Sequence, residues 1–309
     1  MKLFCKLAVL ALISANVSAS KLEIGIAELL EPTNSSESFL VFGTDGRIFE
    51  LEQNRTEDIE LVKQAMKEKL NITVDLGELA QLEDTLDTRN IIESVKLTSN
   101  EKENFSQEAS FENKDRVYGN NALLNDYITD FSSYNDANYY FNRMRTDTRG
   151  KSQCYNRAHV WAWELYQNSY QGSRIQVGKI WLFFSRAYVR NYRYKWWFHI
   201  APTVYVEKRL NVLDRKFATG PVFVKQWTDI FVHSSKTCVE VTRYSDYRRY
   251  NQDPSQDCII MNTSVHYWQP FQIENLETRN QSQNSWAEYE VRKAYRNAIG
   301  WFARPVGMN

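Results

Sequence analysis

The sequence predicts an α+β protein in which a small acidic α/β region precedes a larger region, built from a helix packed on an antiparallel sheet. Three observations support this. Residues 21–115 carry 10 basic and 22 acidic side chains, whereas residues 116–309 carry 26 basic and 16 acidic ones. All 9 Trp and all 18 Tyr lie after residue 115. In the second region an apolar helix pattern is followed by several β-type runs.

The composition of the whole chain excludes some classes of protein. Its 309 residues carry no net charge, which argues against a nucleic-acid partner bound through bulk positive charge. With 43% hydrophobic and 25% charged residues, the chain is expected to be globular and not disordered.

The first 19 residues have the layout of a secretory signal peptide. Lys2 and Lys6 flank the start of a short apolar run, Leu7–Ile13, and the small residues Val17–Ala19 precede a cleavage site. The apolar run is too short to span a bilayer core of about 30 Å. No Cys follows the cleavage site, so a lipid anchor is not expected. We therefore expect a secreted or periplasmic protein without stable membrane insertion.

Residues 20–98 are predicted to form the small acidic α/β region, either a pro-region or a permanent N-terminal domain. The motif Thr44-Asp45-Gly46 predicts a hairpin turn, and the acidic residues after Thr56 favour a helix start. The region contains no His and no Cys, so no catalytic cluster is expected in it. The predicted strands are Ser38–Phe42, Arg47–Leu51, Ile72–Leu76 and Asn90–Leu97, and the predicted helix is Thr56–Leu70.

Residues 99–116 are polar and lack apolar periodicity, which predicts a linker. Lys102, Lys114 and Arg116 would be accessible to trypsin-like proteases if this linker is exposed.

Residues 117–309 are predicted to form the larger region. A turn at Glu207–Arg209 separates two of its strands. The predicted helices are Asn121–Phe131, Tyr134–Met144, Gln153–Tyr166 and Ser285–Phe302, and the predicted strands are Lys179–Val189, Trp197–Val206 and Leu210–Leu213.

Cys154 is the candidate nucleophile. The loop motif Gly150–Ser152 places it in the first turn of the helix Gln153–Tyr166. Unpaired N–H groups at a helix start lower the pKa of a thiol and can also hold an oxyanion. The alternative is a buried Cys that acts as a small hydrophobic residue.

His199 and Asp214 are candidate partners of this thiol. His159 lies five residues after Cys154, about 140° around the helix, and is expected to have a structural role. The turn at Glu207–Arg209 folds Asp214 back to within a few residues of His199. An Asp that orients an imidazole beside a thiolate is a known catalytic arrangement, although an Asp that ends a strand also often caps a turn.

At these residues the chain resembles the bacterial protein-glutaminase family, the secreted protein-glutamine deamidases. The similar segments are FNRMR at 141–145, SQCYNRAH at 152–159, KWWFHIAP at 195–202 and NVLD at 211–214. The resemblance covers roughly residues 120–270. It implies a transglutaminase-like, papain-related catalytic domain preceded by a removable pro-region, for which residues 20–98 are the candidate.

The resemblance also implies residue roles and a reaction. Cys154 would be the nucleophile, His199 the general base and acid, and Asp214 the residue that orients His199. The enzyme would hydrolyse glutamine side-chain amides in proteins through a thioester, with no metal or cofactor. Trp196 and Trp197 are weak candidates for a substrate-binding wall, with core packing as the alternative. The partners would be proteins with accessible glutamines and the chain's own acidic pro-region.

Other functions use the same three residues. A transglutaminase, a cysteine protease or a peptidoglycan amidase or peptidase remain open, as does a non-enzymatic adhesin or inhibitor. The basic second region suits acidic protein substrates or an anionic surface, although a solvated basic face is the ordinary interpretation.

The remaining cysteines have a separate role. Cys238 and Cys258 lie in one polar, Tyr-rich stretch and could close a modest loop as a disulfide. Metal binding is not expected, because no Cys and His pair has the spacing of metal ligands.

We predict that cleavage in the linker converts a near-neutral precursor into a distinctly basic protein. The whole chain has a pI near 6.9, while residues 116–309 have ten more basic than acidic side chains. Isoelectric focusing before and after cleavage tests this. A large fragment that focuses at or below the pI of the precursor would contradict the predicted boundary.

Overall fold

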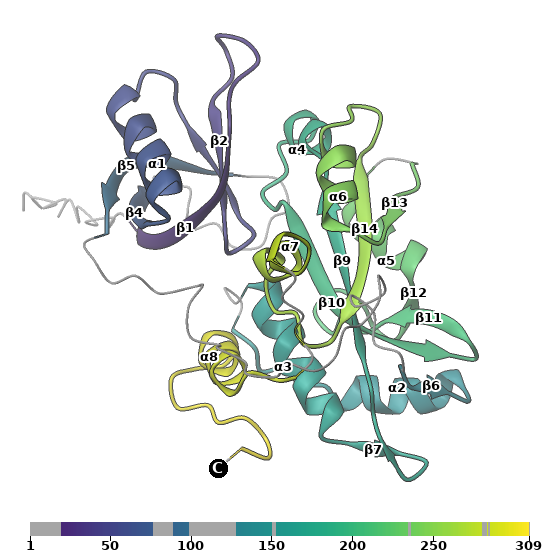
Figure 1. Ribbon diagram of the computed structural model, residues 1–309. Coiled ribbons are helices and arrows are strands. Elements are labelled where there is room, and N and C mark those ends of the chain that lie inside the picture. Colours follow the sequence, from purple (N-terminus) through teal and green to yellow (C-terminus); the bar gives the residue numbers. More distant parts are fainter. Residues whose placement is uncertain are drawn as a thin grey trace, which may run out of the picture.

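The computed structural model describes residues 20–76, 89–98, 128–149, 153–233, 236–279, 283 and 285–308. The predicted signal peptide at 1–19, the linker at 99–116 and the loop Gly150–Ser152 lie outside the described residues. The fold is mixed α/β and consists of an N-terminal barrel beside a larger region (Figure 1).

The N-terminal region is a closed five-stranded barrel with the strand order β1-β2-β3-β5-β4 and one helix. Strand β1 pairs with both β2 and β4, and a register shift between Ile26 and Glu28 lets it serve the two neighbours. Helix α1 buries Ile59, Val62 and Ala65. The elements are β1 (Ser20–Leu30), β2 (Phe39–Gly43), β3 (Ile48–Leu51), α1 (Thr56–Glu68), β4 (Asn71–Leu76) and β5 (Asn90–Leu97). The sequence analysis missed only the long strand β1.

The larger region contains a mostly antiparallel sheet with the order β12-β11-β10-β9-β14-β13, to which β6 adds beside β10. A separate small hairpin joins β7 and β8. The strands of the larger region are β6 (Asp130–Phe131), β7 (Ser169–Tyr170), β8 (Ser173–Arg174), β9 (Gly178–Phe184), β10 (Phe198–Val206), β11 (Arg209–Val212), β12 (Val222–Phe223), β13 (Val239–Val241) and β14 (Cys258–Ser264). Its helices are α2 (Tyr134–Arg143), α3 (Cys154–Tyr166), α4 (Arg186–Asn191), α5 (Val224–Phe231), α6 (Tyr244–Asn251), α7 (Pro270–Arg279) and α8 (Glu288–Ala298).

Three predictions for the larger region were wrong in part. Asp130–Phe131, expected to end a helix, pairs in parallel with Tyr205–Val206, while 121–127 lie outside the described residues. The strand predicted at Lys179–Val189 ends at Phe184, because Ser185 accepts the Tyr188 N–H at 3.0 Å and caps α4. The sheet is also not purely antiparallel, since β13 pairs in parallel with β14. Helices α5, α6 and α7 were not predicted.

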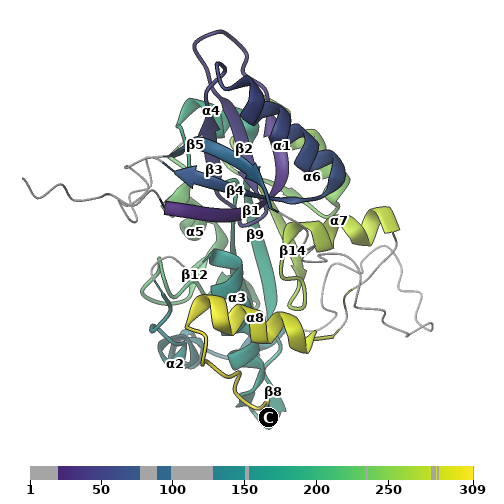
Figure 2. The ribbon, with the colours of Figure 1, turned by 90° about the vertical axis from the view of Figure 1, so that its left-hand side faces the viewer.

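Helix α3 lies between the sheet and the C-terminal helix. It packs against β10 on one side and against α8 on the other (Figure 2). Eleven of its 13 residues are buried, including the polar Asn156, Arg157 and His159, so the helix is enclosed on nearly all sides. Large aromatic side chains such as Trp181, Phe183 and Phe198 fill the core on which it packs.

The barrel and the larger region share one hydrophobic core. Leu40, Phe42 and Ile48 of the barrel belong to the same buried cluster as Phe198. Backbone hydrogen bonds join the two regions as well, from Ile48 N to Lys195 O at 2.7 Å and from Trp197 N to Gly46 O at 3.0 Å. The loop between β2 and β3 therefore lies directly against the start of β10.

Arg89, at the edge of β5, also ties the barrel to the larger region. Its buried side chain donates to the carbonyl oxygens of Val189 and Tyr194, the latter at 2.9 Å, and pairs with Glu50 at 3.1 Å. Burial lowers the pKa of Arg89 to about 10 against the opposing effect of Glu50, so the guanidinium is charged at neutral pH.

None of the described helices is long and apolar enough to cross a membrane.

We predict that Arg89→Met destabilises the full chain by about 3 kcal/mol, because it leaves the buried carbonyls of Val189 and Tyr194 without this donor and removes one of the two arginines that pair with Glu50. Urea unfolding of the full chain measures the loss. Arg55→Met is the matched control, since Arg55 bonds Asp58 and the Glu93 carbonyl within the barrel at a half-exposed position, and should cost less than about 1 kcal/mol. Equal losses in both variants would contradict a special role for Arg89.

Candidate active site

Cys154 begins helix α3, as predicted, and its side chain is buried. The first N–H groups of a helix have no carbonyl partner within the helix, so the start of α3 presents donors beside the thiol. Cys154 is the only free cysteine among the described residues.

The thiol lies against the backbone on both sides of His199. Its Sγ is 4.0 Å from the Phe198 carbonyl oxygen, and the N–H groups of Ile200 and Tyr155 hydrogen-bond it. Strand β11 pairs with β10 over Thr203–Val206, so the stretch around His199 lies beyond this pairing. The edge of β10 thus receives the start of α3.

Burial raises the pKa of the Cys154 thiol to about 12. The nearby Arg157 charge and the two backbone N–H groups lower this pKa but do not offset burial. With the N-terminal region in place, Cys154 is therefore a neutral thiol at physiological pH and needs a base before it can attack.

His199 and Asp214 form a buried pair. The His199 Nε2 and Asp214 Oδ2 atoms lie 2.7 Å apart, and both side chains are almost fully inaccessible. The pairing follows from a tight hairpin, in which Glu207 and Lys208 have positive φ angles of 50° and 65° and Val206 faces Arg209. The carboxylate fixes the proton on Nε2 and leaves Nδ1 as the basic nitrogen of the ring.

Trp227 is a further part of this arrangement that the sequence analysis missed. Its indole Nε1 donates to Asp214 Oδ2 at 2.9 Å, and its ring lies 5.6 Å from the imidazole of His199. Phe217 and Phe231 flank the same imidazole at 5.3 and 4.4 Å. The spacing of Trp227 and Phe231 on α5 indicates only an apolar helix face, so no pattern in the sequence pointed to this role.

The Asp214 carboxylate remains charged although it is buried. Burial by itself raises its pKa, but the contacts with His199, Trp227 and the positive charge of Arg157 outweigh this effect and the pKa is lowered. A charged carboxylate is the form that can orient and stabilise an imidazolium.

Trp196 and Trp197 both contact the N-terminal region, where Trp197 is buried and Trp196 is partly buried. The Trp197 indole donates to the Gly43 carbonyl at 2.7 Å, and Trp196 forms an isolated β-bridge with Arg47. A Cβ atom at Gly46 would lie 3.1 Å from the Phe198 ring, so the loop from Gly43 to Ile48 needs glycine to approach this closely. This loop covers the start of β10 directly before His199.

The other histidines and cysteines lie apart from this group. The His159 Nδ1 atom is 2.7 Å from the Lys179 amino group, which also donates to the Tyr267 carbonyl at 2.6 Å. The structure joins Cys238 to Cys258 by a disulfide with an S–S distance of 1.99 Å. The described part of the chain holds no group of three or more His, Cys, Asp or Glu side chains that could bind a metal ion.

Comparison with known families supports the resemblance drawn from the sequence. Residues 131–231 match the family model Gln_deamidase_2, described as glutaminase. The matched stretch contains Cys154, His199 and Asp214, and it confirms the predicted resemblance to the protein-glutaminase family. No curated protein matches the chain.

Several solved structures are similar. A pro-protein-glutaminase aligns with 92% of this chain and 96% of its own at 16% identity, with a TM-score of 0.47. Its A47Q2 mutant covers 80% and 83% at 16% identity, also with a TM-score of 0.47. Protein-glutaminase from Chryseobacterium proteolyticum covers 55% and 87% at 14% identity, with a TM-score of 0.34.

The rate of Cys154 alkylation is expected to fall as the pH is lowered. We predict that Trp227→Phe moves this fall to a pH higher by about one unit. Without the indole donor the lowered pKa of Asp214 rises, so the carboxylate that supports His199 is lost at a higher pH. The pH dependence of iodoacetamide labelling, measured on protein cleaved in the linker, reports this. Trp181→Phe removes a similar buried indole bond, to Thr263 at 2.8 Å, and should leave the profile unchanged. A shift of the same size in both variants would contradict the assignment.

Proposed function

We propose that this chain, whose residues 131–231 match the glutaminase family, is a secreted protein-glutamine deamidase that is made as a zymogen. The observation that carries the proposal is the arrangement of three side chains. The Cys154 thiol lies against the backbone that flanks His199, and Asp214 holds the Nε2 atom of that imidazole. We also propose a transglutaminase-like, papain-related fold for the catalytic region, since α3 bears the Cys and packs on β10.

The first half of the reaction forms a thioester. His199 Nδ1 takes the thiol proton, and the Cys154 sulfur attacks the carbon of a glutamine side-chain amide. The backbone N–H of Cys154 at the start of α3 stabilises the oxyanion of the tetrahedral intermediate. When the C–N bond breaks, His199 gives its proton to the leaving nitrogen and ammonia departs.

The second half hydrolyses the thioester. His199 removes a proton from water, and the resulting hydroxide attacks the thioester carbon. The C–S bond then breaks and the sulfur recovers its proton from His199, so the product is a glutamate side chain. Asp214 stays charged throughout and stabilises the imidazolium in both halves.

The contacts of the N-terminal region support a zymogen. The loop from Gly43 to Ile48 hydrogen-bonds to Lys195 and Trp197, and Cys154 is buried with a raised pKa while this loop is in place. Cleavage in the linker at residues 99–116 and departure of the barrel would uncover the thiol. A signal peptide at 1–19 and secretion are parts of the same proposal.

We predict that the cleaved protein releases ammonia from casein without releasing peptides or incorporating amines, and that Cys154→Ala reduces ammonia release by at least about 1,000-fold. The three products are measured in parallel on the same samples, before and after cleavage in the linker. Matching thermal unfolding of Cys154→Ala and the parent chain controls for folding.

Each other outcome identifies a rival. Peptides whose release depends on Cys154 would indicate a protease, and Cys154-dependent amine incorporation would indicate a transglutaminase. Equal ammonia release by the Cys154→Ala variant would show that the assigned nucleophile is wrong.

A further inference from the structure

Three arginines form a ridge on the larger region at the boundary with the barrel. Arg186 and Arg190 lie one turn apart on α4, and Arg193 follows the end of this helix. The spacing of four residues places Arg186 and Arg190 on one side of α4, and Arg193 also reaches the barrel, where it pairs with Glu50. We call Arg186, Arg190 and Arg193 the arginine ridge.

Each arginine of the ridge pairs with a carboxylate from a different part of the barrel. Arg186 pairs with Glu28 of β1, and Arg190 pairs with Glu37 of the loop before β2. Arg193 contacts both carboxylate oxygens of Glu50 in β3, at 2.9 and 3.1 Å. The ridge therefore contacts acidic groups from three separate segments of the barrel.

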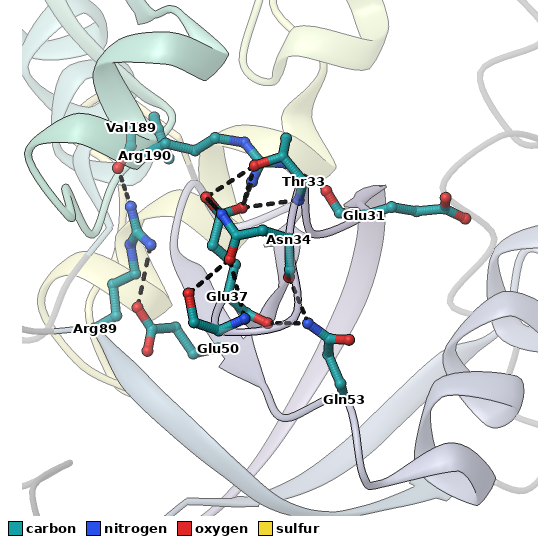
Figure 3. Close-up of polar contacts among 10 residues, drawn as sticks. Glu31, Thr33, Asn34, Glu37, Glu50, Gln53, Arg89, Val189 and Arg190 are labelled. Carbon is teal, nitrogen blue, oxygen red and sulfur yellow. Dashed lines mark hydrogen bonds and ion pairs between the residues drawn. The ribbon is translucent and has the colours of Figure 1, made fainter.

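The barrel itself also hydrogen-bonds one of these carboxylates. Figure 3 shows the Glu37 carboxylate between Arg190 and the side chains of Thr33 and Asn34. The Thr33 N–H and hydroxyl and the Asn34 amide donate to it at 2.9 to 3.0 Å, and these hydrogen bonds lower the pKa of Glu37. The carboxylate is thus presented in its charged form.

The ridge lies close to the candidate active site along the chain. Arg193 precedes His199 by six positions, a span of at most about 20 Å in extended backbone. A segment of the barrel spans the same two places. Gly46 lies against Phe198, and Glu50, four residues after Gly46, pairs with Arg193. A chain bound at the active site can therefore place an acidic residue on the ridge at a short separation.

Departure of the barrel would leave this ridge without its three carboxylate partners. Together these observations point to a second use of the surface. We propose that, in the cleaved enzyme, the arginine ridge binds carboxylates of the protein substrate and directs deamidation to glutamines near acidic residues. This inference rests on the proposed deamidase function and adds the class of substrate sequence.

Two matched peptides with a single glutamine test the inference. In one peptide three aspartates occupy positions four to eight after the glutamine, and in the other serines replace them. The full chain is cleaved in the linker, loss of the N-terminal fragment is verified by mass spectrometry, and ammonia release is measured for both peptides. We expect kcat/KM to be about tenfold higher for the acidic peptide, mainly through a lower KM, and the difference to shrink in 0.5 M NaCl.

Substitutions on the ridge and elsewhere provide the comparison. The triple variant Arg186→Gln, Arg190→Gln and Arg193→Gln should bring the ratio of the two rates close to one. The control variant Arg209→Gln, Arg292→Gln and Arg296→Gln removes the same charge from β11 and α8 and should keep the preference. Arg193→Gln alone, at the most exposed position of the ridge, should lower the ratio even if the triple variant fails to fold.

The outcomes separate the ridge from the chemistry. If the parent enzyme hydrolyses both peptides at equal rates, or if the control variant loses the preference as fully as the ridge variant, the ridge proposal is wrong while the deamidase function stands. If neither peptide releases ammonia although the N-terminal fragment has gone, the proposed function fails. Fluorescence anisotropy of the labelled acidic peptide with the Cys154→Ala protein then tests the ridge by itself, and binding unchanged by the ridge substitutions would overturn it.

Discussion

The hydrogen bond between His199 Nε2 and Asp214 Oδ2 is the interaction on which the site depends. A carboxylate with almost no exposed surface is unfavourable unless donors and positive charge compensate for its lost hydration. Here the imidazole and the Trp227 indole both donate to one oxygen, and Arg157 adds a positive charge nearby. The hairpin, the aromatic residues of α5 and the start of α3 all serve to complete this environment.

The burial that fixes the His199 imidazole also raises the pKa of the Cys154 thiol. Cys154 lies in a core shared between the barrel and the larger region, so water that would stabilise a thiolate is excluded. A site arranged in this way is well oriented but has a neutral nucleophile. The proposed removal of the barrel would change the solvation of the Cys154 thiol.

The charge asymmetry of the chain has a structural counterpart. Glu28, Glu37 and Glu50 of the acidic N-terminal region form ion pairs with the arginine ridge on α4 and directly after it. Such pairs at partly exposed positions each contribute little to stability, but several together fix orientation and partner choice. The buried contacts of Arg89 and the shared apolar core also join the two regions. The ion pairs thus favour one orientation of the barrel on the larger region, and the apolar core packs the two regions together.

The sequence determined much of the fold and the candidate triad. Hydrophobic period and turn residues predicted the hairpin of the barrel, helix α1, helix α3 and the strands β10 and β11, because these elements depend on local patterns. The turn at Glu207 brought Asp214 towards His199 in the prediction as it does in the structure. Local patterns failed where tertiary contacts decide, as at Ser185, whose cap ends β9 and starts α4.

Only the tertiary structure assigned Trp227, whose indole bond to Asp214 joins residues on different elements and leaves no mark in the apolar face of α5. It also showed that Trp196 and Trp197 contact the barrel. The division of charge at residue 115 was visible in the sequence, but which arginine meets which carboxylate was not. Those pairings depend on how β1, the loop before β2 and β3 converge on α4, and convergence of distant segments is a property of the folded chain.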